Sequence, residues 1–196
     1  MTRHARVRSY EPQIRVDEPL IARPDTTIRH GREEPMMPVS VGDKIPDVEV
    51  RTMGADGPIT VRTSEVLGTG RVVLFGVPGA FTPGCSKVHL PGFVQHADEL
   101  IGKGVSKVAC VSVNDAWVMD AWGRSQGAED KILMIADGNG EFTRAMGLEF
   151  DATGLGLGIR SQRYAAVIED GVIARLDVER VPGVDVSSCE AVLSHL

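Results

Sequence analysis

The chain has 196 residues, of which 42% are hydrophobic, and a formal net charge of −6 at pH 7. This length suffices for one domain with a substantial core, and the acidic balance argues against nucleic acid or a membrane surface as partner. Three widely spaced cysteines without a CxxC pair exclude a secreted disulfide framework, a zinc ribbon and a thioredoxin dithiol. No run of about 18 apolar residues is present to span a membrane, so we expect a soluble protein of the cytoplasm.

The first part of the chain differs in composition from the rest. Residues 1–38 hold 7 Arg, 6 acidic residues and 5 Pro, without a periodic apolar face, so we expect this extension to be disordered. Its first ten residues contain three Arg and no acid, as a mitochondrial transit peptide would, but the acidic residues that follow argue against that alternative. The folded domain is therefore predicted at residues 39–196.

The domain is predicted to begin with a β-hairpin and a buried strand. Alternation around residues 48–50, the Asp56-Gly57 turn signal and residues 59–61 indicate the hairpin. A short helical turn is expected at residues 63–67. The apolar, β-branched run at residues 71–77 is typical of a strand in the core.

A stretch dense in Gly and Pro, residues 76–89, joins this strand to a helix. The spacing of later apolar residues predicts a helix that begins near Cys85, is kinked by Pro91 and closes at residues 102–104. Unpaired backbone N–H groups and the helix dipole favour negative charge at such an N-terminus, and the thiolate is the reactive form of cysteine. Cys85 is therefore predicted to be a redox nucleophile, and the alternative is a packed core thiol.

Strands and helices alternate through the rest of the chain, which indicates an α/β domain with a mixed central sheet flanked by helices and a C-terminal hairpin and helix. In the helix at residues 116–126, Trp117 and Ala121 share one face. The remaining expected elements are a strand at 107–113, a strand at 132–136, a short helix at 141–146, a mobile glycine-rich loop at 151–161, a hairpin of residues 164–168 and 172–178, and a helix at 189–196 capped by Ser187 or Ser188.

At the strand-to-helix turn the residues carry a family resemblance. Pro78-x-x-x-Thr82-x-x-Cys85 matches the PxxxTxxC active-site motif of peroxiredoxins, and the run from Gly76 to Phe93, GVPGAFTPGCSKVHLPGF, resembles their type II, or peroxiredoxin-5, branch. The resemblance covers residues 39–196. It implies a thioredoxin-like fold and a thiol peroxidase that reduces hydrogen peroxide and alkyl hydroperoxides without a cofactor or metal.

The resemblance also implies roles for three residues. Cys85 would be the peroxidatic cysteine, which attacks a hydroperoxide and becomes a sulfenic acid. Thr82 would hydrogen-bond the peroxide. Arg163, reaching the site from a sheet strand, would stabilise the thiolate and the charge on the leaving oxygen, since it is permanently cationic; the alternative is an exposed strand charge.

Three further residues are candidates for the pocket. Pro78 stiffens the loop and withholds an N–H donor, and the Gly84 backbone approaches the substrate closely. His89 follows Cys85 by four residues and is expected to pack near the pocket and tune it. A metal site built on this Cys/His pair is the alternative, but further ligands are missing nearby.

The other cysteines bear on how the oxidised sulfur is reduced. Cys110 lies among apolar residues, which favours an inert core thiol over a resolving cysteine, and Cys189 is a second candidate for resolution. If neither resolves, an external thiol must act: glutathione with glutaredoxin, slightly favoured, or thioredoxin. The expected partners are therefore a hydroperoxide, a thiol reductant and a second copy of the chain, which pairs through the face beside the active-site loop.

Two alternatives stay open. Trp117 and Trp122 either contribute to that dimer face or belong to the core. The alternative function is a redox-sensing or signalling protein that uses oxidation of Cys85 to modify a partner.

Overall fold

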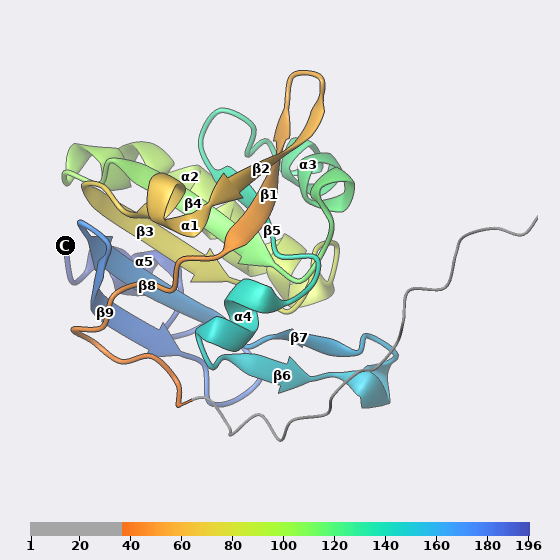
Figure 1. The fold of residues 1–196 in the computed structure, drawn as a ribbon. Coiled ribbons are helices and arrows are strands. Elements are labelled where there is room, and N and C mark those ends of the chain that lie inside the picture. Colours follow the sequence, from red (N-terminus) through yellow and green to blue (C-terminus); the bar gives the residue numbers. More distant parts are fainter. Residues whose placement is uncertain (1–36) are drawn as a thin grey trace, which may run out of the picture. The chain divides into compact units, whose positions relative to one another are not determined.

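A seven-stranded mixed sheet forms the centre of the computed structural model, which describes residues 37–196 (Figure 1). Its strand order is β2-β1-β5-β4-β3-β8-β9, in which β3, β4 and β5 run parallel and the other pairs are antiparallel. The bounds of its strands are β1 Glu49–Gly54, β2 Gly57–Arg62, β3 Arg71–Gly76, β4 Lys107–Ser112, β5 Leu133–Ala136, β8 Tyr164–Glu169 and β9 Val172–Val178.

Position in the sheet follows the residue pattern. β3 reads Arg-Val-Val-Leu-Phe-Gly and its last five residues are buried, as expected for a central strand covered on both faces. The β1–β2 hairpin turns at Ala55 and Asp56, one residue earlier than the predicted Asp56-Gly57, and Gly57, with a φ of 129°, begins β2. The C-terminal hairpin of β8 and β9 turns at Asp170 and Gly171, as predicted.

Helices cover the sheet on two faces (Figure 1). On one face α2, α3 and α5 pack a core that includes Phe93, Trp122 and Val192. On the other, α1 and α4 contribute Leu67 and Phe142 to a second core. The helices are α1 Thr63–Leu67, α2 Leu90–Gly102, α3 Ala116–Ser125, α4 Glu141–Ala145 and α5 Cys189–Leu193. The mixed sheet with flanking helices, C-terminal hairpin and last helix confirms the predicted fold class.

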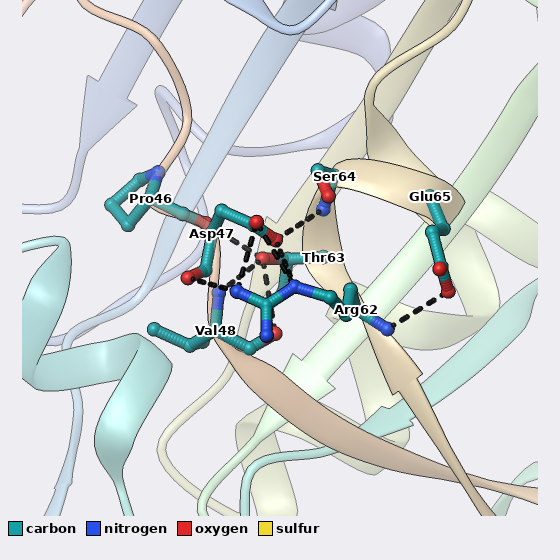
Figure 2. Close-up of polar contacts among 7 residues, drawn as sticks. All are labelled: Pro46, Asp47, Val48, Arg62, Thr63, Ser64 and Glu65. Atoms are coloured by element: carbon teal, nitrogen blue, oxygen red, sulfur yellow. Dashed lines mark hydrogen bonds and ion pairs between the residues drawn. The ribbon is translucent and has the colours of Figure 1, made fainter.

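A polar cluster joins the start of α1 to the chain that leads into β1 (Figure 2). Thr63 is fully buried; its Oγ1 donates to the Pro46 carbonyl at 2.6 Å and accepts from the Val48 N–H at 2.9 Å. The Arg62 guanidinium donates to the Asp47 carboxylate at 2.9 Å and, with further hydrogen bonds, lowers the pKa of Asp47 to about 2. The cluster therefore fixes the β1–β2 hairpin against α1.

One sequence prediction needs correction, and the structure places the two tryptophans that the sequence left open between core and dimer face. The segment at residues 151–161 is not only a loop: β6 (Glu149–Asp151) and β7 (Ile159–Ser161) pair antiparallel around a short 3-10 turn, Thr153–Leu155. Strands of three residues are too short to show alternation, and the glycines between them masked the pairing. The face of α3 that carries Trp117 and Ala121 is exposed, whereas Trp122 is fully buried in the core.

The predicted disorder at residues 1–38 falls almost wholly outside the described residues, so it stays a prediction together with the domain boundary. Within residues 37–196, no helix combines the length and apolar character needed to cross a bilayer.

Candidate active site

Cys85 lies where the loop after β3 enters a helix, as the sequence predicts, and it is fully buried. Two contacts hold the loop. The Ala80 N–H donates to Asn114 Oδ1 at 3.0 Å, and the Val77 N–H extends the β3–β4 pairing to the Val111 carbonyl at 3.0 Å. Phe81, at the tip of the loop, has a φ of 61°, a conformation uncommon for a residue with a side chain. The loop is thus tied to the carboxyl end of β4 while it delivers the sulfur.

The helix that carries Cys85 begins as a π-helix, Cys85–His89, before α2 continues from Leu90. In this turn the Leu90 N–H donates to the Cys85 carbonyl, five residues back. Pro91, expected to kink the helix, lies at the junction where the π-helical turn gives way to α2. Single π-turns inside helices are rare and frequently occur at functional sites.

The Arg163 guanidinium contacts the Cys85 sulfur directly. Arg163 precedes β8, whose Tyr164 pairs with Gly76 at the end of β3, and this register brings the guanidinium to the active-site loop. Arg163 Nη2 donates to Cys85 Sγ at 3.3 Å and Nη1 lies 3.0 Å from His89 Nδ1. The predicted pairing of Cys85 with a distant arginine therefore exists as a contact, across 78 residues of sequence.

His89 is held in one tautomer. Its Nε2 lies 2.9 Å from the Ser187 carbonyl, which only accepts, so Nε2 carries the proton and Nδ1 accepts from Arg163. The ring packs at a tilt against the stacked pair of Phe75 and Phe93, at centroid distances of 5.0 and 5.6 Å. Burial lowers the pKa of His89 to about 4, so the ring is neutral at pH 7 and serves as an acceptor for the arginine.

The buried imidazole makes stability depend on pH. Because native His89 has a pKa of about 4 and the unfolded residue one of 6.5, the unfolded state binds more protons between these values. We therefore expect the free energy of unfolding to be highest above pH 6.5 and to fall, by up to about 3 kcal/mol, as the pH drops through 4. Urea unfolding at pH 7 and pH 4.5 measures this loss.

The control for that measurement is a pair of variants, His89→Leu and His96→Leu, since His96 lies on the same helix with its side chain 28% exposed. The His89 variant is expected to lose much less stability than the wild type between the two pH values, and the His96 variant to behave like the wild type. Equal losses in all three proteins would show that His89 does not carry the effect.

The other predicted pocket residues surround the sulfur on the loop. Thr82 Oγ1 donates to the Gly79 carbonyl at 2.8 Å, which leaves its lone pairs as acceptors. Gly84 lies beneath the guanidinium, where an added Cβ would come within 3.1 Å of Arg163 Nη2. Pro78 is half-buried between β3 and Gly79. The structure places these residues in the active-site loop, and their roles toward a substrate stay predictions.

Cys110 and Cys189 are both buried free thiols. Cys110 lies in β4 opposite Phe75 of β3, and burial raises its pKa well above the usual value. Cys189 begins α5, with its Cβ near Gly92 of α2, and burial raises its pKa to about 12. Neither is a thiolate at neutral pH in this conformation.

Sequence reasoning missed two parts of the site. Trp122 Nε1 donates to Ser86 Oγ at 3.0 Å and so ties α3 to the residue after the nucleophile. Glu179, just after β9, accepts three hydrogen bonds from residues 185–187 and so holds Ser187 beside His89. The sequence indicates only a core or dimer role for Trp122, and Glu179 belongs to no local motif that could have pointed to it.

The chain is similar to known proteins over most of its length. The family model described as Redoxin matches residues 40–193. Peroxiredoxin-2E-2, chloroplastic, of Oryza sativa subsp. japonica is 48% identical over 163 residues, 81% of this chain and 72% of the relative.

Solved structures agree with this match. Reduced Prx3 from Vibrio vulnificus, in complex with H2O2, is 46% identical with a TM-score of 0.77, and the alignment covers 80% of this chain and 98% of that one. Peroxiredoxin 5 from Alvinella pompejana is 36% identical with a TM-score of 0.71, over 81% of this chain and 100% of that one.

Proposed function

The chain belongs to the peroxiredoxins of the Redoxin family, and we propose that Cys85 is the peroxidatic cysteine of this thiol peroxidase. The contact of Arg163 Nη2 with Cys85 Sγ at 3.3 Å is the observation that supports this assignment. A guanidinium beside the sulfur stabilises the thiolate, the form that attacks peroxide.

The proposed reaction is a two-electron transfer to the peroxide bond. The Cys85 thiolate attacks the terminal oxygen of the hydroperoxide, the S–O bond forms as the O–O bond breaks, and the leaving oxygen takes up a proton to become water or an alcohol. Arg163 stabilises the charge that develops on that oxygen, and Thr82, with the backbone N–H groups of Gly84 and Cys85, holds the peroxide in line. Cys85 ends as a sulfenic acid.

We infer that hydrogen peroxide and alkyl hydroperoxides are both substrates, and that an external thiol completes the cycle. Burial and the raised pKa values of Cys110 and Cys189 disfavour both as resolving cysteines in this conformation. One thiol would condense with the sulfenic acid, releasing water and forming a mixed disulfide, and a second would displace Cys85 as a thiol. Glutathione with glutaredoxin fits these two successive thiol steps best, and thioredoxin is the second candidate.

Intact mass after one equivalent of hydrogen peroxide tests the proposal. We expect the protein to gain one oxygen, mapped by peptide analysis to Cys85, and then to turn over rapidly when a thiol is supplied. Loss of two hydrogens would instead show an intramolecular disulfide and its partner. A sulfenic acid that persists with thiol present would favour the redox-sensing function, and oxygen on another cysteine would contradict the assignment of Cys85.

The expected homodimer remains a proposal. Trp117 is 66% exposed and Phe81 is 57% exposed, which supports an apolar contact beside the active-site loop, whereas buried Trp122 does not face a partner.

The cytoplasmic location also stays a prediction. The rice relative is named chloroplastic, and the segment in which a transit peptide would lie falls outside the described residues.

A further inference from the structure

Glu179 connects the loop after β9 to the active site. A single carboxylate oxygen, Oε1, accepts from the Asp185 N–H at 2.6 Å, the Ser187 N–H at 3.0 Å and the Ser187 hydroxyl at 2.7 Å. Its own N–H donates to the Arg163 carbonyl at 2.9 Å. Glu179 therefore holds both the loop that carries Ser187 and the backbone of the active-site arginine.

The Ser187 carbonyl, which this loop positions, contacts His89 in the active site. It accepts from His89 Nε2 at 2.9 Å, which fixes the proton on that nitrogen and directs the Nδ1 lone pair at Arg163 Nη1, 3.0 Å away. The other terminal nitrogen of the guanidinium donates to Cys85 Sγ at 3.3 Å. One continuous chain of contacts therefore runs from Glu179 through Ser187, His89 and Arg163 to the sulfur.

The loop depends on this carboxylate for its position. Within the described residues, the side-chain hydrogen bonds that attach residues 180–187 to the rest of the domain go to Glu179 and His89. One backbone hydrogen bond, from the Ser188 N–H to the Asp185 carbonyl at 3.1 Å, closes a turn before α5. Val181 is 70% exposed, so packing adds little constraint there. Ser187, by contrast, is fully buried. Without the acceptor at residue 179, three donors lose their partner and the Ser187 carbonyl is free to move away from His89.

Given the proposed peroxidatic role of Cys85, we propose that Glu179 is a positioning residue for peroxide reduction, which acts through Ser187 and His89 to orient the Arg163 guanidinium. The carboxylate touches neither the sulfur nor the substrate. What it contributes is the hydrogen-bond acceptor, since one oxygen collects all three donors; an amide oxygen at the same place provides an acceptor without the charge.

The test is the second-order rate of Cys85 oxidation by hydrogen peroxide, followed by rapid quench with an alkylating agent and mass analysis. Glu179→Ala is expected to slow oxidation about 10-fold, less than the roughly 100-fold that a misplacement of 1 Å can cost, because Arg163 keeps its own contacts. Glu179→Gln, which keeps an acceptor oxygen, is expected to restore most of the rate. Asp177→Ala is the matched control, because this acid lies two residues earlier in β9, pairs with Arg175 and is expected to leave the rate unchanged.

A double-mutant cycle tests whether Glu179 acts on the site through His89. In a His89→Leu background, Glu179→Ala is expected to add little further loss, because the intermediate contact is already gone. An equal loss in both backgrounds, a wild-type rate in Glu179→Ala, or a Glu179→Gln variant as slow as the alanine variant would overturn the proposal. Urea unfolding of each variant separates a folding defect from a slower reaction, and a wild-type protein that is not oxidised at Cys85 would contradict the proposed function instead.

Discussion

Replacing Cys85 with serine is expected to abolish peroxide consumption, with a loss of at least about 1,000-fold against the wild type. A hydroxyl at this position is not ionised at neutral pH and cannot accept the oxygen as sulfur does. The substitution is close in volume, and Arg163 Nη2 beside this buried position can donate to the serine hydroxyl, so the domain should keep its fold. The measurement is hydrogen peroxide removal with a thiol reductant in excess.

Cys110→Ala and Cys189→Ala serve as the matched controls, since both residues are buried cysteines of the same domain. Each variant is expected to retain oxidation of Cys85 in a single turnover. A variant that oxidises normally but no longer turns over with thioredoxin would identify its missing residue as the resolving cysteine. Residual turnover in Cys85→Ser near the wild-type rate would refute the assignment of the nucleophile.

Removing the guanidinium at residue 163 is expected to have the next largest effect. Arg163→Met deletes the donor to Cys85 Sγ and the positive charge beside it, and should slow oxidation of Cys85 about 100-fold, as the loss of one preorganised donor does in other enzymes. The methionine keeps most of the side-chain volume, so the effect should appear in rate more than in stability. The second-order rate constant with hydrogen peroxide measures it.

Arg163→Lys separates charge from geometry. An ammonium retains the charge but lacks the planar fork that serves Cys85 and His89 at once, so an intermediate loss of about 10-fold is expected. Arg175→Met, on β9 and paired with Asp177, is the control and should react like the wild type. If the lysine variant were as fast as the wild type, charge alone would explain the role of residue 163.

Local signals predicted most of the fold. The hairpin around Asp170-Gly171 and the buried strand at residues 71–77 follow from turn chemistry and apolar runs, which depend on neighbouring residues alone. The π-helical turn at Cys85–His89 was beyond such rules, because it is defined by where each N–H finds its acceptor. The strand β7 is too short and too close to glycines for its pairing with β6 to be read from the pattern.

The same limit applies to the site: residues with a local sequence signal could be predicted, and residues linked through the tertiary structure could not. Cys85 was found from its place at a strand-to-helix turn, and the peroxiredoxin motif supported it. The approach of Arg163 came from family resemblance alone, because no physical rule links residues 78 positions apart before the β3–β8 register is known. Glu179 was missed because its importance lies in a tertiary hydrogen-bond route and not in the residues beside it.

The π-helical turn sets the direction of the Cys85 side chain relative to the rest of its helix. A π-turn contains one residue more than the α-turn it replaces, and each residue of an α-helix rotates about 100° around the axis. If the same residues were wound here as a regular α-helix, Cys85 would be turned by about 100° relative to α2 and its core residue Phe93. The wide turn takes up that extra residue, so the phase of the helix, as much as the identity of its side chains, aims the sulfur at Arg163.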